Sequence, residues 1–145
     1  MKRLIYILPL MLLCACGTST KSAMTSKVLL DAVDTTTPLS IVYFYEYNGE
    51  RFVEVTSDAP YIFDRPVIGY ETYKHRRETN YVVYMAQTED FEIPSSILNV
   101  SQLHPRDAVL EQLKKSLWVT FGWGTVYVYK IAGDSLVYDH MDIIE

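Results

Sequence analysis

The chain has few of the groups from which catalytic or metal chemistry is usually built. Among its 145 residues are three histidines and only two cysteines, Cys14 and Cys16. It contains no Gly-x-Ser-x-Gly, no His-Glu-x-x-His and no phosphate-binding glycine loop. Because no cysteine follows residue 16, the remainder of the chain has no disulfide and must be held together by an apolar core. We therefore expect a protein that is not an enzyme and that needs no cofactor or metal.

The histidines do not suggest a metal site. His104 precedes Pro105 and is expected at the start of a helix. His140 lies in Asp139-His140-Met141-Asp142, which offers an imidazole and carboxylates. Side chains alternate along a strand, so His140 should point away from Asp139, and a catalytic zinc normally takes three protein ligands. The sequence therefore predicts a paired surface histidine.

The formal net charge of −5 excludes some partners. An acidic domain repels polyphosphates, so nucleic acid is not expected to bind. The longest basic run is Lys74-His75-Arg76-Arg77. It could meet lipid phosphates or an acidic partner, but a solvated hairpin tip is the simpler interpretation.

The N-terminus has the pattern of an export signal. Met1-Lys2-Arg3 is basic, and residues 4–13 form an apolar run of about ten residues, whereas a membrane span takes roughly 20. Leu13-Cys14-Ala15-Cys16-Gly17 follows. This N-terminus resembles the signal of bacterial lipoproteins, whose lipobox places Leu three residues before the modified Cys and a small residue directly before it.

The resemblance implies that residues 1–15 are removed, that Cys16 carries a diacylglycerol and an acylated amine, and that the net charge becomes −7. Residues 16–27 are then a flexible tether and residues 28–145 a single β-rich domain. More than one acyl chain makes a stable membrane anchor. Gly17 after the cysteine implies an outer-membrane location facing the periplasm, under the sorting rule of enteric bacteria. An ordinary secretory signal or a retained membrane segment is the alternative.

The clearest structural pattern is a hairpin at residues 41–55. Asn48-Gly49 suits a type I′ turn, in which both central residues need positive φ. That turn places Val42, Phe44, Val53 and Val55 on one face. The opposite face receives the aromatic set Tyr43, Tyr45, Tyr47 and Phe52.

A second hairpin is predicted near the C-terminus, with Gly133-Asp134 as its turn. In that register Tyr129 opposes Tyr138 and Tyr127 opposes His140. Other segments with secondary-structure patterns are the strand candidates 67–74 and 81–87, the short apolar segment 28–33, and a helix over 105–117 with an apolar stripe.

These patterns predict an α+β domain, mainly antiparallel sheet built from hairpins, with one helix packed on it. A small β-sandwich or barrel is the alternative. Tyrosine rows can anchor a protein or stack on sugars. We expect a lipid-anchored envelope protein that binds another envelope component through Tyr43, Tyr45, Tyr47, Phe52, Tyr127 and Tyr129. A polysaccharide-binding lipoprotein module is the second interpretation, and a small periplasmic hydrolase is the third.

Overall fold

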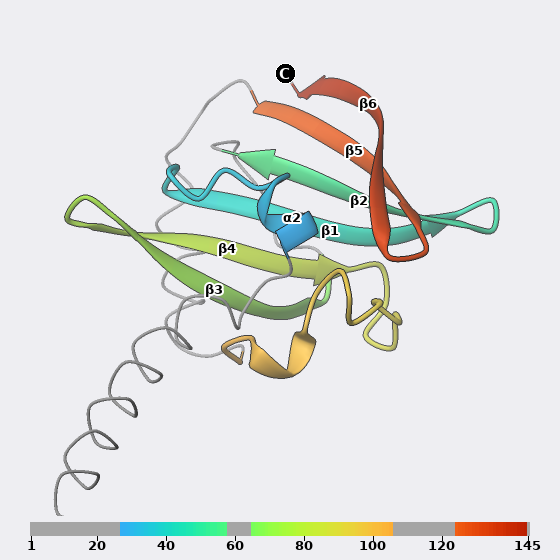
Figure 1. Ribbon diagram of the computed structural model, residues 1–145, viewed down its shortest axis with the longest axis horizontal. Coiled ribbons are helices and arrows are strands. Elements are labelled where there is room, and N and C mark those ends of the chain that lie inside the picture. The colour runs from blue at the N-terminus through green and yellow to red at the C-terminus, as the bar shows by residue number, and fades with distance from the viewer. Residues whose placement is uncertain (1–26, 58–64, 106–123, 145) are drawn as a thin grey trace, which may run out of the picture.

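A six-stranded sheet dominates the computed structural model, which describes residues 27–57, 65–105 and 124–144 (Figure 1). Its strands are β1 (Leu39–Tyr47), β2 (Glu50–Ser57), β3 (Val67–His75), β4 (Glu78–Ala86), β5 (Gly124–Ala132) and β6 (Ser135–Ile144). A single helical turn, α2 (Lys27–Leu30), precedes the sheet, and the short 3₁₀ helix η1 (Val100–Gln102) follows β4. The expectation of a β-rich fold is therefore confirmed.

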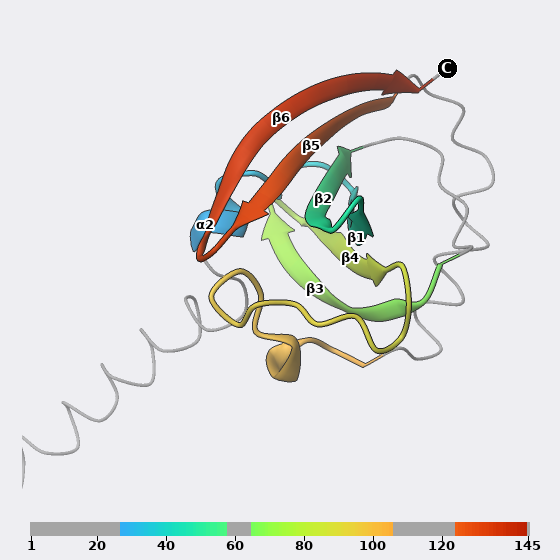
Figure 2. The same cartoon turned by 90° about the vertical axis from the view of Figure 1, so that its right-hand side faces the viewer.

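The strands lie in the order β3-β4-β1-β2-β5-β6. Three hairpins, β1–β2, β3–β4 and β5–β6, are joined side by side. The contact between β2 and β5 is antiparallel, whereas β1 and β4 run parallel, so the sheet is mixed. The described strands form one open sheet, and its twist turns β5 and β6 well away from the direction of β1 and β4 (Figure 2).

The turns follow the residue chemistry of the sequence. Asn48 and Gly49 have φ of 52° and 77°, as a type I′ turn requires. The pairs run from Tyr47–Glu50 at the turn through Tyr45–Phe52 to Val42–Val55, so the predicted division of this hairpin into two faces is confirmed. Gly133, with φ of 60°, likewise occupies the turn between β5 and β6.

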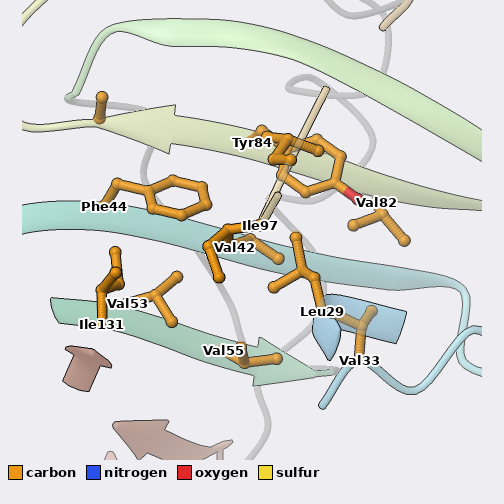
Figure 3. Close-up of a cluster of buried hydrophobic side chains, with 12 residues drawn as sticks. Leu29, Val33, Val42, Phe44, Val53, Val55, Val82, Tyr84, Ile97 and Ile131 are labelled. Atoms are coloured by element: carbon orange, nitrogen blue, oxygen red, sulfur yellow. The ribbon is translucent and has the colours of Figure 1, made fainter. Parts of the chain in front are cut away.

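One face of the sheet, here called the valine face, carries Val42, Phe44, Val53 and Val55 and forms the main core (Figure 3). Leu29 from α2 and Ile97 from the loop after β4 pack onto it. The opposite face, here called the tyrosine face, carries Tyr43, Tyr45, Tyr47 and Phe52 on the first hairpin, because strand side chains alternate. Segment 28–33, for which the sequence left strand or helix open, overlaps the helical turn, which ends at Leu30.

A polar group is buried on the valine face near the edge strand β3. Glu71 is fully buried, and the hydroxyls of Tyr73 and Tyr84 both donate hydrogen bonds to its Oε2. Asn80 on β4 is also buried and donates from Nδ2 to the Thr35 carbonyl at 2.9 Å. These bonds satisfy polar groups that would otherwise destabilise the core.

Two predictions lie outside the described residues. The helix expected over 105–117 falls almost wholly there, and so does Cys16 with the export signal. Within the described part of the chain, no helix is long and apolar enough to cross a membrane.

Candidate interaction surface

The hairpin β1–β2 places four aromatic side chains on the tyrosine face. Tyr45 stands directly opposite Phe52, while Tyr43 and Tyr47 flank Tyr45 two residues away along β1. The centroids of the Tyr43 and Tyr45 rings are 5.4 Å apart and their planes differ by 17°. The rings of Tyr45 and Phe52 are 5.5 Å apart and differ by 21°. The sequence therefore builds a stacked aromatic ladder of Tyr43, Tyr45 and Phe52.

The ladder becomes more exposed toward the turn. Tyr43, Tyr45 and Phe52 are half-buried, whereas Tyr47 is 66% exposed. Further from the turn, the same face carries buried residues such as Ile41. Contact with another molecule is therefore available at the turn end of the ladder, around Tyr47.

Charged groups border both ends of the ladder. The guanidinium carbon of Arg65 lies 5.3 Å from the centroid of the Tyr43 ring, and Arg65 Nη1 donates to the Tyr43 hydroxyl at 3.1 Å. Nearer the turn, Lys130 Nζ lies 2.6 Å from Glu50 Oε1 across the neighbouring strands. These contacts hold long side chains beside the rings. Nothing in the sequence pattern indicated the position of Arg65, which lies just before β3.

The hydroxyl of Tyr45 is hydrogen-bonded to the carboxyl of Glu54, which lies on the same face of β2. Desolvation, followed by the negative charge of Glu54, raises the pKa of Tyr45 to about 12. Desolvation also raises the pKa of Glu54, and the hydrogen bond from Tyr45 partly opposes that shift. The ladder therefore carries a carboxyl group whose ionisation is disfavoured.

Tyr127 and Tyr129 do not belong to this surface. Val55 stands opposite Tyr127 and Val53 opposite Tyr129, so both tyrosines lie on the valine face. Tyr129 packs against the core there, whereas Tyr127 is exposed. The prediction that all six aromatic residues share one surface is therefore wrong, because the register between β2 and β5 could not be read from either hairpin alone.

The register of the second hairpin also departs from its prediction. Tyr129 opposes Tyr138 as expected, but a bulge at Asp139 places Met141, rather than His140, opposite Tyr127. The bulge also turns Asp139 toward the imidazole, where its Oδ2 lies 2.5 Å from His140 Nδ1. His140 Nε2 is 3.2 Å from Asp142 Oδ2. Hydrogen bonding to Asp139 is the main cause that raises the pKa of His140.

The other histidines and the basic run have structural positions. His104 exchanges two main-chain hydrogen bonds with Tyr70, at 3.1 and 2.9 Å. The run of residues 74–77 forms the tip of the β3–β4 hairpin, where Arg76 has φ of 58°. Among the described residues, no group of three or more acidic, histidine or cysteine side chains is arranged to hold a metal ion.

The aromatic ladder, bordered by Arg65 and by the Lys130–Glu50 pair, is therefore the surface on this hairpin best suited to bind another molecule. Comparison of the chain with protein-family models, with curated proteins and with solved structures found no match.

Proposed function

We propose that this chain is a non-enzymatic lipoprotein of the bacterial cell envelope that binds another envelope protein through the turn end of the aromatic ladder. The observation that carries the binding proposal is the stacking of Tyr43, Tyr45 and Phe52 beside the exposed Tyr47. Rings held by one another lose little conformational entropy when a partner covers them. Aromatic side chains of this kind dominate the energetics of protein interfaces.

The anchor proposal rests on the lipobox resemblance at residues 13–17. Diacylglycerol on Cys16 would hold the domain at the membrane, with the chain after Gly17 as its tether. The outer-membrane location and the packing of a helix over residues 105–117 on the sheet, which would make the fold α+β, are parts of the same proposal. Labelling cells with palmitate tests the anchor: the wild-type chain should incorporate the label and Cys16→Ala should not. An unlabelled, water-soluble wild-type chain would refute it.

Affinity capture from detergent-solubilised envelopes tests the binding surface. The substitution Tyr47→Ala should reduce recovery of the partner at least about fivefold, because an exposed aromatic anchor at an interface commonly contributes more than about 1 kcal/mol. Tyr127→Ala is the matched control, since Tyr127 is also exposed but lies on the valine face. Equal recovery with wild type and Tyr47→Ala would contradict the proposed surface.

A glycan is the second candidate ligand, and the position of Glu54 favours it. A carboxyl group beside half-buried rings could accept hydrogen bonds from sugar hydroxyls while the rings stack on the sugar. The same capture experiment separates the two classes, because an enriched polysaccharide that is lost with Glu54→Gln would identify a glycan. A protein that is retained by Glu54→Gln and lost with Tyr47→Ala would identify a protein partner.

A further inference from the structure

Strand β6 forms one edge of the sheet in the described part of the chain, and its exposed side chains are unusually apolar for an edge. On the valine face, Tyr138 is 57%, Met141 47% and Ile143 64% exposed, beside Tyr127 on β5. Figure 2 shows β6 as the outermost strand, with β5 on its inner side. Soluble proteins usually protect an edge of this length with lysine, proline, a β-bulge or a covering element. The bulge at Asp139 interrupts β6 only before His140, and the pairing with β5 is regular from His140 to Ile144. An edge with exposed apolar side chains is suited to pairing with another strand.

The charges on β6 limit which strand can pair with it. His140 and Asp142 project from the tyrosine face, because they stand opposite Val128 and Val126. They lie two residues apart, differ in the sign of charge that each can carry, and contact each other within one chain at 3.2 Å. That contact has to be exchanged when a neighbouring strand supplies the partner. A strand that places a carboxylate opposite His140 and a basic group opposite Asp142 would therefore complement this edge.

A second copy of β6 satisfies this condition in one register. Two-fold antiparallel pairing of identical strands puts one residue on the axis and keeps corresponding faces on the same side. With Met141 on the axis, His140 of each copy opposes Asp142 of the other. With Asp142 on the axis two carboxylates would meet, and with His140 on the axis two imidazoles would meet.

We propose that the chain forms a two-fold dimer in which the β6 strands of two copies pair antiparallel about Met141. The two sheets then continue through the pair, and the Met141 side chains contact each other on the valine face. On the opposite face, two His140–Asp142 contacts between the copies lie on either side of the axis and replace the His140–Asp142 contact within each chain. This pairing uses β6 and is independent of the aromatic ladder and of the lipid anchor.

Charge exchange on the full-length chain in detergent tests the register, with sedimentation velocity over a range of concentrations as the measurement. We expect the wild-type chain to dimerise and His140→Asp to weaken dimerisation about tenfold or more, because two attractive pairs become repulsive. Asp142→Lys should weaken it similarly. An equimolar mixture of the two variants should restore the dimer, because the introduced lysine then faces the introduced aspartate. Both side chains are exposed, so neither change should alter folding.

Cysteine cross-linking supplies a second readout that does not depend on charge. Met141→Cys places two thiols across the axis, where opposed residues of antiparallel strands have Cα atoms about 5 Å apart, within the range of a disulfide. Ile143→Cys is the matched control, because its copies would lie roughly 13 Å apart along the strands. The wild-type chain is the background control, because any disulfide that it forms must involve its own cysteines, Cys14 and Cys16.

Three results would overturn the dimer: a wild-type chain that remains monomeric at every concentration, dimerisation that is unchanged by His140→Asp, or cross-linking as efficient with Ile143→Cys as with Met141→Cys. The first would show that the edge is free or pairs with another protein. The other two would show that copies associate through a different surface.

Discussion

The hydroxyl of Tyr45 and the carboxyl of Glu54 share a hydrogen bond beside the aromatic ladder, and desolvation raises the pKa of both groups. Tyr45 therefore connects the stacked rings of the ladder to the carboxyl group of Glu54, whose protonation depends on pH. Because Tyr45 also stacks on Tyr43 and Phe52, a change at Glu54 should be detectable in the ladder.

Replacing Glu54 with Gln should stabilise the protein slightly at neutral pH. The pKa of Glu54 in the folded state lies above its ordinary value of 4.5, so the stabilisation from its protonated form is complete below that value and is lost as pH rises through the folded-state pKa. Because the side chain is only half-buried, the gain at pH 7 should be less than about 1 kcal/mol. Urea unfolding of Glu54→Gln and wild type at pH 3.5 and pH 7 measures it.

The gain should be small or absent at the lower pH, where the wild-type carboxyl is protonated. The pKa of Tyr45, followed by its ultraviolet absorbance, should fall from about 12 toward 10 in the same variant. A Glu54→Gln protein that is less stable than wild type at pH 7 would contradict the assigned cause.

His140 should titrate above the ordinary histidine value of 6.5, and Asp139 should be the main reason. Asp139→Asn should lower the pKa of His140 more than Asp142→Asn, because the bond to Asp139 is the larger contribution and the shorter one. The charged imidazole is the form that both carboxylates favour, so its interactions are complete below pH 6.5 and are lost as pH rises through the folded-state pKa. Nuclear magnetic resonance of the imidazole protons against pH measures each shift.

An equal shift from the two substitutions would show that the bulge at Asp139 does not direct that carboxylate at the ring. Wild-type His140 titrating below 6.5 would exclude both contacts in solution.

Glu71 should contribute strongly to stability although it is a buried acid. In Glu71→Ala, the Tyr84 hydroxyl loses its acceptor inside the core, and we expect the free energy of unfolding to fall by about 3 kcal/mol. Glu71→Gln should cost less, because an amide oxygen can still accept from Tyr84 and Tyr73. Equilibrium urea unfolding followed by circular dichroism measures both. Glu78→Ala, at the exposed hairpin tip, is the control and should change stability by less than about 0.5 kcal/mol.

If Glu71→Ala proved as stable as wild type, the hydrogen bonds of Tyr73 and Tyr84 to Glu71 would contribute little to stability.

Gly69 should not tolerate a side chain. A Cβ atom there would lie 2.7 Å from the His104 carbonyl oxygen and 2.8 Å from Leu103 Cβ. The carbonyl oxygen belongs to the main chain, so it cannot move aside as the end of a flexible side chain could. Because the segment at residues 103–104 is hydrogen-bonded to Tyr70, it cannot move without losing those bonds. Gly69→Ala should destabilise the protein by about 2 kcal/mol in the same urea measurement.

Thr72→Ala, at an exposed position on the same strand, is the matched control and should have a smaller effect. Equal stability of the two variants would mean that the close approach is absent in solution.

The sequence predicted local pairing better than the arrangement of the hairpins. Asn48-Gly49 and Gly133 fix their turns by backbone chemistry, so the residues nearest each turn were placed correctly. The pairings of β1 with β4 and of β2 with β5 depend on packing between distant segments, and no turn specifies them. That is why Tyr127 was assigned to the wrong surface.

The bulge at Asp139 shows a second limit of the sequence pattern. One extra residue reverses the alternation of side chains, and Asp139-His140 carries no glycine or proline to mark it. The buried state of Glu71 was equally hidden, because a charged residue within a strand ordinarily indicates an exposed position.

The parallel contact between β1 and β4 has a consequence for how the chain folds. Each of the three hairpins closes through a short turn and can form within microseconds, before the others are present. The pairing of β1 with β4 and that of β2 with β5 bring together strands that are far apart in the sequence. Because closing long loops costs conformational entropy, these two pairings should form last and limit the folding rate. Until they form, the inner strands of the finished sheet are themselves open edges. A newly synthesised chain would pass through a stage with more unpaired strand edges than the native protein retains. Rapid formation of these two strand pairings would protect it from aggregation.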